Sequence, residues 1–467
     1  MRVVCIGSGY VGSVTGTAFA ALGYETTIID IDQNKVDLMN SGKSPIFEPG
    51  LDELIEKYIH EKLFATTSYE IVNEADVIFI GVGTPSKKDG TADLTYIKFA
   101  ANSIAKNLNP NKFTVIVDKS TVPVGTGDEV ERIIEEATDL KSGVHFAVVS
   151  NPEFLREGYA VEDVFFPDRV IIGSNDDKAK SIMQDLYLNL IERKNYAEIF
   201  KGFNFEQRLK GTKPEYFETD IRSAEMIKYA SNSFLAVKIS YINEIARLSE
   251  TLGANVLDVA KGMGMDSRIG SKFLEVSSGW SGSCFPKDTA ELLATSQAYN
   301  CELSIVKAAM DSNLKMHSYC VKKMEQALGT LKDKKVGILG LTFKPNTDDA
   351  RKTQARYIIQ ELVNLGAVVK VHDPQGAKMF KELNPDLPVV YCLEKEDVFE
   401  EADGVMLLTH WEEYLDIPWK NVKDKMNMPF VFDTRNFLNK DQLVDLGYTY
   451  EGLGIGKNER SQQSILM

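Results

Sequence analysis

The chain has 467 residues, about three times the ~150 of a typical domain, so a single small module is excluded and two or three domains are expected. Hydrophobic residues make up 43% and charged residues 26% of the chain, close to globular averages, which excludes wholesale disorder. The formal net charge of −15 disfavours nucleic acid and anionic membrane surfaces as partners, although a local cluster of Arg and Lys could still hold an anionic small substrate.

The N-terminal elements form one βαβ unit. Residues 2–6 are a short apolar run, which the glycine pattern 7–12 and an alanine-rich helical stretch to Leu22 follow. A β-branched run at 26–30 completes strand, glycine turn, helix and strand within about 30 residues. Because the apolar start lacks a basic leader and runs straight into the glycines, we interpret it as a buried strand and not as a signal peptide.

Gly7, Gly9 and Gly12 have the GxGxxG spacing of a dinucleotide-binding turn. The first glycine permits the tight turn, the second lets the backbone approach a pyrophosphate, and the third allows close helix packing. Asp30 ends the second strand and could accept both ribose hydroxyls, while its charge would repel a 2′-phosphate. The pattern therefore favours NAD over NADP, although Lys35 lies nearby; a flavin site or a glycine turn without a ligand is the alternative.

Further apolar runs predict strands, with helical stretches between several of them, at 77–81, 114–118, 146–150 and 170–173. Strands that alternate with helices imply a parallel sheet covered on both faces. We expect this NAD-binding Rossmann domain to span residues 1–212, with an irregular but aromatic segment from about 174 to 220.

The rest of the chain predicts a helical domain and a second α/β domain. Helical patterns favour a central helical domain over residues 213–325. At 335–340 the opening theme of apolar run and glycine returns, which predicts a C-terminal Rossmann-like domain over 326–467; its glycines do not complete GxGxxG, so a dinucleotide site is not favoured there. The predicted fold class is therefore α/β, with two Rossmann-like doubly wound parallel-sheet domains joined by a central all-helical region.

Some segments follow predicted strands at their carboxyl ends, where ligands bind in open α/β sheets: 81–85, 119–125 and 151–158. The first two could equally be simple turn chemistry. The third presents Glu153 and Glu157 four residues apart, which one helical turn would place on the same side. Such a pair could be catalytic, and the alternative is an ordinary solvated face.

The glycine-rich segment before a predicted helix gives the sharpest chemical signal. Ser283 is expected to cap this helix, so that Cys284 lies at the helix N-terminus beside Lys287. Both the helix N-terminus and the lysine favour the nucleophilic thiolate, and Asp288 lies one turn further on. The alternative is a structural thiol.

The chain has an odd number of cysteines and no CxxC pair, so neither a metal site nor a disulfide lattice is expected. The other cysteines are interpreted as packing residues: Cys5, Cys301, Cys320 and Cys392. This usage indicates a reducing compartment, and no run reaches the ~18 apolar residues of a membrane span. We expect a cytoplasmic protein that binds neither membrane nor nucleic acid.

On the long helical stretch, Lys228 and Asn232 lie four residues apart and share a face that apolar residues flank. A partly buried lysine beside an amide could stabilise an oxyanion. The alternative is a lysine that snorkels at the edge of the core.

Several motifs along nearly the whole chain resemble those of the UDP-glucose/GDP-mannose dehydrogenase family. They are 7–12, Phe47-Glu48-Pro49-Gly50-Leu51, 119–125, 151–158, Pro167-Asp168-Arg169-Val170, 225–236, 279–288, Phe343-Lys344 and 348–351. This resemblance implies an NAD-dependent enzyme that oxidises the C6 hydroxyl of UDP-glucose to a carboxylate, giving UDP-glucuronate, while two NAD molecules are reduced in turn. Cys284 would trap the intermediate aldehyde as a thiohemiacetal, from which a second hydride leaves a thioester that water hydrolyses.

The resemblance also implies roles for individual side chains. Lys228 would stabilise the oxyanion, Asn232 would hold the sugar, and Asp288 would take or relay the hydroxyl proton. Glu153 would act as the base for thioester hydrolysis, with Thr121 positioning the water. The implied cofactor contacts are Gly7, Gly9, Tyr10, Val11, Gly12, Asp30, Lys35, Thr84, Pro85, Thr121, Glu157, Lys287 and Arg351. The implied substrate contacts are Glu153, Phe154, Leu155, Lys228, Asn232, Arg268, Phe273, Gly282, Phe343, Lys344 and Arg435.

The family's sugar nucleotide lies between its two α/β domains, so the resemblance makes residues 326–467 a UDP-sugar-binding domain and 213–325 a dimerisation domain. Arg268 resembles an arginine that reaches into a neighbouring subunit's site, which implies a homodimer or a larger homo-oligomer. The chain departs from the family where Ser281 stands in place of the usual glycine and where the stretch 185–220 is longer than the usual spacer. Both departures bear on hexose specificity and assembly contacts.

Other functions stay open beside UDP-glucose oxidation. Dehydrogenases of UDP-N-acetylhexosamines and of GDP-mannose are the nearest, and the run 151–154 followed by 167–169 favours UDP-glucose. A non-catalytic NAD-binding regulatory protein is the remaining alternative. Such a protein would have lost its nucleophile, whereas Cys284, Lys228 and Asp288 are all present.

Overall fold

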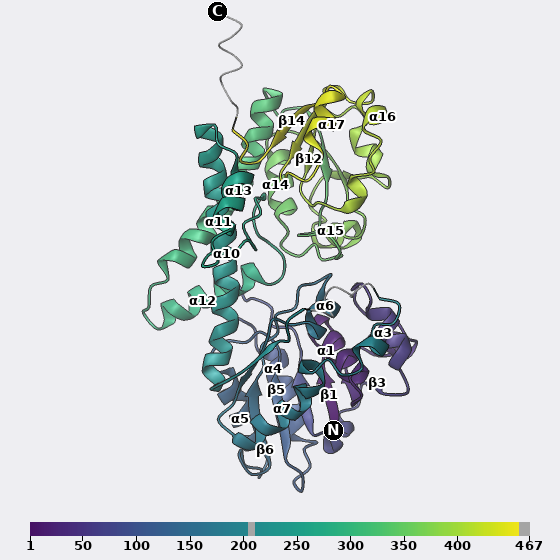
Figure 1. Ribbon diagram of the computed structural model, residues 1–467, viewed down its shortest axis with the longest axis vertical. Helices are drawn as coiled ribbons and strands as arrows, with labels where there is room; N and C mark the ends of the chain where they lie inside the picture. The colour runs from purple at the N-terminus through teal and green to yellow at the C-terminus, as the bar shows by residue number, and fades with distance from the viewer. Residues whose placement is uncertain (204–210, 457–467) are drawn as a thin grey trace, which may run out of the picture. The chain divides into compact units, whose positions relative to one another are not determined.

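The computed structural model describes residues 1–203 and 211–456 (Figure 1). Part of the long spacer expected at 185–220 therefore lies outside the described residues. The chain divides into two compact units, Met1–Ser231 and Asn232–Met467, and the division falls within one long helix. Each unit is built around one sheet.

The sheet of the first unit has the strand order β3-β2-β1-β4-β5-β6-β7-β8. Neighbouring strands run parallel except β6 and β7, which pair antiparallel. The strands are β1 (Arg2–Ile6), β2 (Glu25–Ile29), β3 (Leu63–Thr66), β4 (Val77–Ile80), β5 (Thr114–Asp118), β6 (Phe146–Ser150), β7 (Arg169–Gly173) and β8 (Glu215–Thr219).

Helices cover both faces of this sheet. They are α1 (Tyr10–Ala21), α2 (Gln33–Asn40), α3 (Leu51–Tyr58), η1 (Glu70–Glu74), α4 (Thr95–Ala105), α5 (Thr126–Ala137), α6 (Ala160–Phe165), α7 (Asp177–Ile191) and α8 (Tyr196–Ile199). Val3 and Cys5 join the core under α1, α3, α6 and α7, whereas Val4 and Ile6 join the core under α4 and α5. Because successive strand residues point to opposite faces, this alternation makes the sheet doubly wound.

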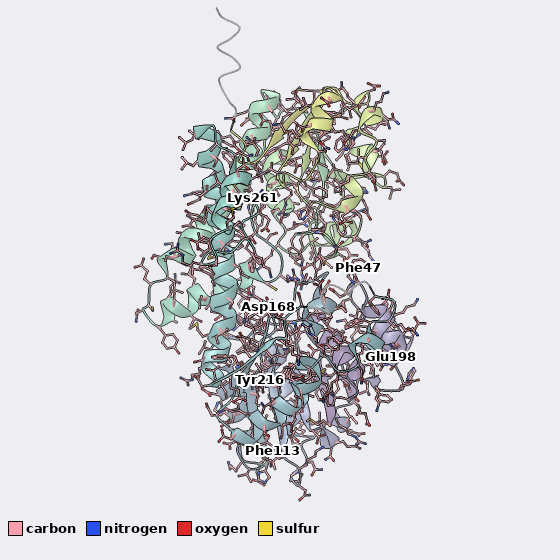
Figure 2. All side chains as sticks on the ribbon, viewed as in Figure 1. Phe47, Phe113, Asp168, Glu198, Tyr216 and Lys261 are labelled. Atoms are coloured by element: carbon pink, nitrogen blue, oxygen red, sulfur yellow. The ribbon has the colours of Figure 1, made fainter. Side chains whose placement is uncertain are left out.

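The glycine turn before α1 and the predicted strands that correspond to β1, β2, β4, β5, β6 and β7 are confirmed, whereas β3 was not predicted. The irregular pattern of residues 174–220 did not predict α7 and the edge strand β8, which this segment contains, whereas its aromatic residues Tyr196, Phe200 and Phe203 pack in or against the core and the segment is no free linker. Asp176 caps α7 by accepting a hydrogen bond from the Ala179 amide, and Tyr216 of β8 packs against the core (Figure 2). The first sheet therefore extends past residue 212, and the division into three domains stays a prediction.

The second unit contains the predicted helical stretch and a second sheet. The long helix α10 (Ile221–Leu252) begins in the first unit; α11 (Val256–Gly264), α12 (Phe285–Ala298) and α13 (Ser304–Leu328) follow. The sheet is parallel, with the order β11-β10-β9-β12-β13-β14. Its strands are β9 (Lys335–Leu339), β10 (Val368–His372), β11 (Val389–Tyr391), β12 (Gly404–Leu407), β13 (Phe430–Asp433) and β14 (Thr449–Gly452).

The second sheet is also covered on both faces. The remaining helices are α14 (Gln354–Asn364), α15 (Ala377–Leu383), η2 (Lys395–Phe399), η3 (Glu412–Tyr414), α16 (Trp419–Lys423) and α17 (Lys440–Asp445). Val336 and Ile338 of β9 pack with α13, α14 and α15, whereas Leu339 packs with η2, α16 and α17. Within the ranges 1–203 and 211–456, no helix combines the length and apolar character needed to cross a bilayer.

The acid that ends β10 differs in its surroundings from the acid after β2. Asp373 Oδ2 accepts hydrogen bonds from the Leu341 and Thr342 amides, the Thr342 hydroxyl and the Trp411 indole. Its Oδ1 accepts the amides of Gln375 and Gly376. Protein donors therefore occupy both oxygens of this carboxylate, which has its counterpart in Asp30 of the first unit.

Candidate active site

The glycine turn of the first unit leaves room for a phosphate. Gly7 has a φ of 97°, and a Cβ added to Gly12 would lie 1.8 Å from the Gly7 carbonyl oxygen, so both positions require glycine. A Cβ added to Gly9 would meet no atom within 4 Å. Gly9 is also the N-cap of α1 and has no side chain to cap it. The N-terminal amides of α1 are thus presented across an open surface, which fits a pyrophosphate.

Asp30 holds the glycine turn in place. Its Oδ2 accepts the Ser8 amide at 2.7 Å and the Ser8 hydroxyl at 2.6 Å, and its Oδ1 accepts the Asp32 amide at 2.9 Å. Burial alone would raise the pKa of this carboxyl, but these hydrogen bonds and the charge of Lys35 lower it. The carboxylate therefore stays ionised, and a second anion beside it would be repelled.

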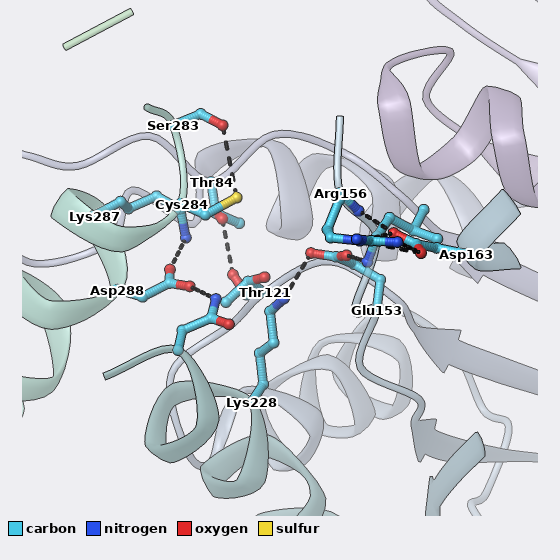
Figure 3. Close-up of polar contacts among 12 residues, drawn as sticks. Thr84, Thr121, Glu153, Arg156, Asp163, Lys228, Ser283, Cys284, Lys287 and Asp288 are labelled. Atoms are coloured by element: carbon cyan, nitrogen blue, oxygen red, sulfur yellow. Dashed lines mark hydrogen bonds and ion pairs between the residues drawn. The ribbon is translucent and has the colours of Figure 1, made fainter. Parts of the chain in front are cut away.

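The loops after β4 and β5 are joined near the turn. Thr84 Oγ1 donates to the Thr121 carbonyl oxygen at 2.8 Å, and Pro85 follows on the exposed side of its loop (Figure 3). The Tyr10 hydroxyl donates to the Phe47 carbonyl oxygen at 3.0 Å, while Val11 is partly buried in the first turn of α1. These predicted cofactor contacts lie on segments that share the carboxyl edge of one sheet.

Glu153 and Lys228 form a buried ion pair. Lys228 Nζ lies 2.9 Å from Glu153 Oε1, and the Leu155 amide donates to Glu153 Oε2 at 2.6 Å (Figure 3). The Phe154 ring has Lys228 Nζ 5.2 Å from its centroid and the Arg169 guanidinium carbon 4.1 Å from it. Burial would raise the pKa of Glu153, but the Lys228 charge and these hydrogen bonds lower it. Glu153 is therefore held as a carboxylate.

Asn151 connects this pair to two residues that the sequence did not single out as functional. Lys119 Nζ donates to Asn151 Oδ1 at 2.9 Å, and the Tyr187 hydroxyl donates to the same oxygen at 2.5 Å. Asn151 Nδ2 donates to the Ile171 carbonyl oxygen at 2.8 Å. The segment that carries Glu153 is thus fixed from β5, β7 and α7.

Glu48 fixes the other end of that segment. Its carboxylate accepts the amides of Gly158 and Ala160, each at 2.6 Å, at the start of α6. Arg156 Nη2 pairs with Asp163 at 2.7 Å. Glu157 therefore lies in a loop that is held at both sides, although the motif alone gave no partner for Glu48.

A buried acid pair lies beside the start of α5. Glu225 accepts the amides of Gly125 at 2.6 Å and Gly127 at 2.8 Å, and burial raises its pKa to about 7. Burial, with the nearby Glu225, raises the pKa of Asp118 to about 8. Neither carboxyl oxygen of Asp118 has a hydrogen-bond partner among the described residues, so Asp118 is a neutral acid at pH 7.

In the second unit, Cys284 lies at the N-terminus of α12. The expected Ser283 cap is wrong: Cys284 itself is the N-cap residue, and the Ser283 hydroxyl lies 3.6 Å from its Sγ. Lys287 Nζ lies 2.6 Å from Asp288 Oδ1, and Asn232 Nδ2 donates to Asp288 Oδ2 at 2.6 Å (Figure 3). A lysine and a buried carboxylate are thus paired on the first turn of α12 after the thiol, and an amide of α10 bonds to the same carboxylate.

Asn313 of α13 fixes the loop that leads to Cys284. Asn313 Oδ1 accepts the Trp280 amide and Asn313 Nδ2 donates to the Trp280 carbonyl, both at 2.8 Å. The Trp280 indole donates to the Ser240 hydroxyl at 2.9 Å. Gly279 has a φ of 125°, and a Cβ there would lie 2.7 Å from Asn313 Oδ1. The sequence gave no signal that α13 supports the nucleophile.

The segment after β9 contacts the same loop. Gly282 has a φ of 86°, and a Cβ there would lie 2.8 Å from the Phe343 ring, so the ring packs directly on the backbone. The Ser281 hydroxyl donates to Gln354 Oε1. Ser281, which departs from the family pattern, therefore links the cysteine loop to the start of α14.

The other predicted substrate contacts have local partners. Lys344 Nζ lies 5.5 Å from the Phe343 ring centroid, and Arg435 Nε donates to the Leu408 carbonyl at 2.8 Å. Phe273 has a φ of 64° and its ring centroid lies 6.3 Å from that of Phe285. Arg351 and Arg268 each pair with an acid two residues earlier, Asp349 at 2.8 Å and Asp266 at 2.6 Å. The Arg268 side chain is 88% exposed.

Comparisons with known proteins cover nearly the whole chain. Residues 1–191 match the NAD binding domain of the UDP-glucose/GDP-mannose dehydrogenase family, residues 222–315 its central domain and residues 337–440 its UDP binding domain. A UDP-glucose 6-dehydrogenase of Rhizobium meliloti (strain 1021) is 42% identical over 461 residues, covering 97% of this chain and 99% of that protein.

Two solved structures are also similar to this chain over nearly its whole length. A UDP-glucose dehydrogenase from the hyperthermophilic archaeon Pyrobaculum islandicum is 34% identical, with a TM-score of 0.85 over 98% of each chain. A UDP-D-ManNAc dehydrogenase from Pyrococcus horikoshii is 26% identical, with a TM-score of 0.82 over 97% of this chain and 99% of that one.

Proposed function

The chain belongs to the UDP-glucose/GDP-mannose dehydrogenase family, and from this premise we propose that it oxidises the C6 hydroxyl of UDP-glucose to a carboxylate with two molecules of NAD. The observation that carries the proposal is Cys284 at the start of α12, where Lys287 and Asp288 lie on the first turn and Asn232 of α10 donates a hydrogen bond to Asp288. A nucleophile and a proton acceptor in that arrangement suit the oxidation of an alcohol through a thioester.

The glycine turn and Asp30 account for the cofactor. The open surface at Gly9 and the amides of α1 would hold the pyrophosphate, and the ionised Asp30 disfavours a 2′-phosphate. When bound, NAD supplies the hydride acceptor for each of the two oxidations. The loop contacts of Thr84 and Thr121 would shape the nicotinamide side of the site.

We assign the first oxidation to Asp288, Lys228 and Asn232. Asp288, held by Lys287 and Asn232, would take the proton of the C6 hydroxyl through water as the hydride leaves. Lys228 and Asn232 lie four residues apart on α10 and so share a face of that helix, where they would hold the oxygen that develops negative charge. The product of this step is an aldehyde.

The covalent stage follows at Cys284. Its thiolate adds to the aldehyde carbon, giving a thiohemiacetal whose C6 carries the second hydride. Loss of that hydride leaves a thioester, and water, activated by Glu153, attacks the carbonyl carbon and releases the thiolate. One alcohol and one water thus give one carboxylate, two hydrides and three protons. Without the covalent stage, a reactive aldehyde could escape.

The hexose and the nucleotide are the finer part of the proposal. The relative named a UDP-glucose dehydrogenase is 34% identical to this chain, and the one named a UDP-D-ManNAc dehydrogenase is 26% identical. This difference supports UDP-glucose over a UDP-N-acetylhexosamine. Lys344 and Arg435, in the part that matches the UDP binding domain, are cations suited to a diphosphate.

We also propose that the enzyme is a homodimer through α10. Phe234, Tyr241, Leu248 and Leu252 are 50% to 71% exposed and recur at intervals of seven or four residues, so they share one apolar face of the helix. A second copy with the same face would cover it, and the exposed Arg268 could then contribute to the partner's site. Phe234→Glu with Tyr241→Glu should give monomers in sedimentation velocity. Tyr299→Glu, at an exposed aromatic residue just after the C-terminus of α12, is the control and should leave dimers.

We place the reaction in the cytoplasm. All the cysteines of the chain are free thiols, which a reducing compartment preserves. Cys284 must be among them for the covalent stage to occur, so an oxidising compartment would oppose the activity.

Counting NADH per sugar tests the proposed function. Purified protein with NAD and limiting UDP-glucose should form about two NADH per sugar, as a four-electron oxidation requires. A ratio near one would refute the four-electron scheme, and faster turnover of UDP-N-acetylglucosamine or GDP-mannose would refute the assigned substrate. Cys284→Ser should not turn over, and wild-type rates from that variant would refute the covalent stage.

A further inference from the structure

A second buried lysine lies behind the Glu153–Lys228 pair, and the mechanism above does not use it. Lys119 is 8% exposed, and its Nζ bonds to Asn151 Oδ1 at 2.9 Å and lies 3.5 Å from the Tyr187 hydroxyl. Both of these partners are neutral groups. A buried cation whose hydrogen-bond partners are neutral needs a nearby negative charge to offset the cost of its burial.

The negative charge that interacts with Lys119 is the Glu153 carboxylate. Asn151, its hydrogen-bond partner, precedes Glu153 by two residues in the segment after β6. Lys119 acts with Lys228 to lower the pKa of Glu153, against the effect of burial. Burial in turn lowers the pKa of Lys119 to about 8, while Glu153 raises it and Lys228 lowers it further. Two cations thus share one anion.

The other fully buried ionisable groups around this cluster are neutral at pH 7. Burial raises the pKa of Cys5 on β1 to about 12, and it raises the pKa of Tyr187 on α7 well above its usual value. The fully buried charges are therefore Lys119, Glu153 and Lys228, with a net charge of +1, and the guanidinium of the partly exposed Arg169 lies 4.1 Å from the Phe154 ring centroid. One further negative charge would balance the cluster.

Hydrolysis of the thioester creates that negative charge. Water attack on the carbonyl gives a tetrahedral oxyanion, and Lys228 is the cation assigned to it. If Lys228 were the only partner of Glu153, its move to the oxyanion would leave a buried carboxylate uncompensated at the moment when that carboxylate must accept a proton. With Lys119 present, the charges of Lys119 and Lys228 balance those of the Glu153 carboxylate and the oxyanion.

We propose that Lys119 is a positioning residue that keeps Glu153 ionised while Lys228 turns to the oxyanion, so that its charge is needed above all in thioester hydrolysis, the step in which Glu153 must accept a proton. This inference rests on the proposed function and deepens it. The leaving group is the Cys284 thiolate, and the proton that Glu153 accepts comes from the attacking water. Lys119 exchanges no proton or electron in this step.

Rapid mixing of enzyme with NAD and saturating UDP-glucose tests the proposal. Lys119→Met should give a burst of about two NADH per active site, followed by steady turnover at least about tenfold slower than wild type, because acyl-enzyme accumulates. The acidic limb of the pH profile of kcat should move to higher pH, since Glu153 would then be easier to protonate. The burst amplitude counts folded active sites, so partial misfolding does not alter the rate per site.

Tyr187→Phe is the matched control. It removes a hydroxyl from the same hydrogen-bond network without changing a charge, and it should leave the acidic limb in place and turnover within about threefold of wild type. Lys119→Arg keeps the charge and should restore fast hydrolysis. It also tests the proposal if the methionine variant does not fold, because an arginine should extend hydrolysis above pH 8, where Lys119 loses its proton.

The proposal would be overturned by wild-type turnover and an unmoved acidic limb in Lys119→Met. Equal losses in Lys119→Met and Tyr187→Phe, without a burst, would also overturn it, because they would indicate a merely structural role. The proposal would also be overturned if the rate of thioester hydrolysis in Lys119→Arg fell at the same high pH as in wild type. Failure of the proposed function is distinguished by the wild type, which would then not form two NADH per UDP-glucose.

Discussion

Asn313 clamps the loop that leads to Cys284 through two hydrogen bonds to Trp280, and we predict that removing this clamp strongly lowers stability and kcat. Asn313 itself does not touch the substrate in the proposed mechanism. Asn313 holds the amide and the carbonyl of Trp280 through two hydrogen bonds of 2.8 Å, and its side chain is buried. Asn313→Ala leaves both backbone groups unsatisfied in the interior. Each such group costs about 1–3 kcal/mol, so for the two groups we expect a loss of about 2–6 kcal/mol in the free energy of unfolding, part of it local to the loop.

The assay follows the loop through its thiol. Urea unfolding measures the loss of stability, and the rate of Cys284 alkylation by iodoacetamide measures how the thiol is presented. Asn313→Ala should change the alkylation rate and lower kcat at least about tenfold. NAD affinity should stay unchanged, because the glycine turn belongs to the first unit.

A substitution that removes only one hydrogen bond is the control for the size of this loss of stability. Asn243 accepts one hydrogen bond, from the Ser277 amide at 3.0 Å, and is equally buried. Asn243→Ala should therefore cost about half as much and should affect the thiol less. If Asn313→Ala lies within about 0.5 kcal/mol of wild type with an unchanged alkylation rate, the clamp does not position Cys284 and the reasoning is refuted.

Other substitutions test the glycine contact, the buried acid and the cofactor preference. Gly282→Ala should raise the KM for UDP-glucose, because it combines a positive φ with a clash against Phe343; Gly329→Ala, which has a similar φ of 75° in open space, should leave that KM unchanged. Because the pKa of Asp118 is raised to about 8, the contribution of this group to stability is complete below about pH 4 and is lost as the pH rises through 8. Asparagine does not titrate, so the free energy of unfolding of Asp118→Asn in urea should increase relative to that of wild type between pH 5 and pH 8. Asp30→Ser should weaken the preference for NAD over NADP by about tenfold or more, whereas Ser8→Ala, which keeps the carboxylate, should retain it; an unchanged preference in Asp30→Ser would contradict the assigned repulsion.

The elements that the sequence predicted well are those with short-range signals. The glycine turn, its flanking strands and Asp30 lie within about 30 residues, and the spacing of the glycines follows from steric contacts inside the turn. The helix after Cys284 was also predicted, although its cap was placed one residue too early. Local geometry alone decides these features.

The supports of the site were not predicted, because each joins residues far apart in the chain. Lys119 and Asn151 are 32 residues apart, Trp280 and Asn313 are 33 apart, and Glu48 lies 110 residues before Gly158. Such pairs depend on how strands and helices are arranged after folding, which a single sequence does not reveal.

Helix α7 and strand β8, two of the elements that were not predicted, were missed for different reasons. Helix α7 had a signal that the prediction overlooked: an Asp176 cap followed by buried positions spaced three or four residues apart. Strand β8 had none, because it lies at the edge of its sheet and its side chains are mostly exposed. Edge strands lack the apolar run that marks a central strand.

An aspartate follows the corresponding strand in each sheet, Asp30 after β2 and Asp373 after β10, but the two carboxylates have different roles. This difference limits how the protein could be re-engineered. Asp373 is saturated by amides, a hydroxyl and an indole, so no lone pair is left for a ribose. Grafting glycines alone onto the C-terminal half would therefore not install a second coenzyme pocket. A designer would first have to free that carboxylate, starting with the Trp411 indole, and find new support for the turn it now holds.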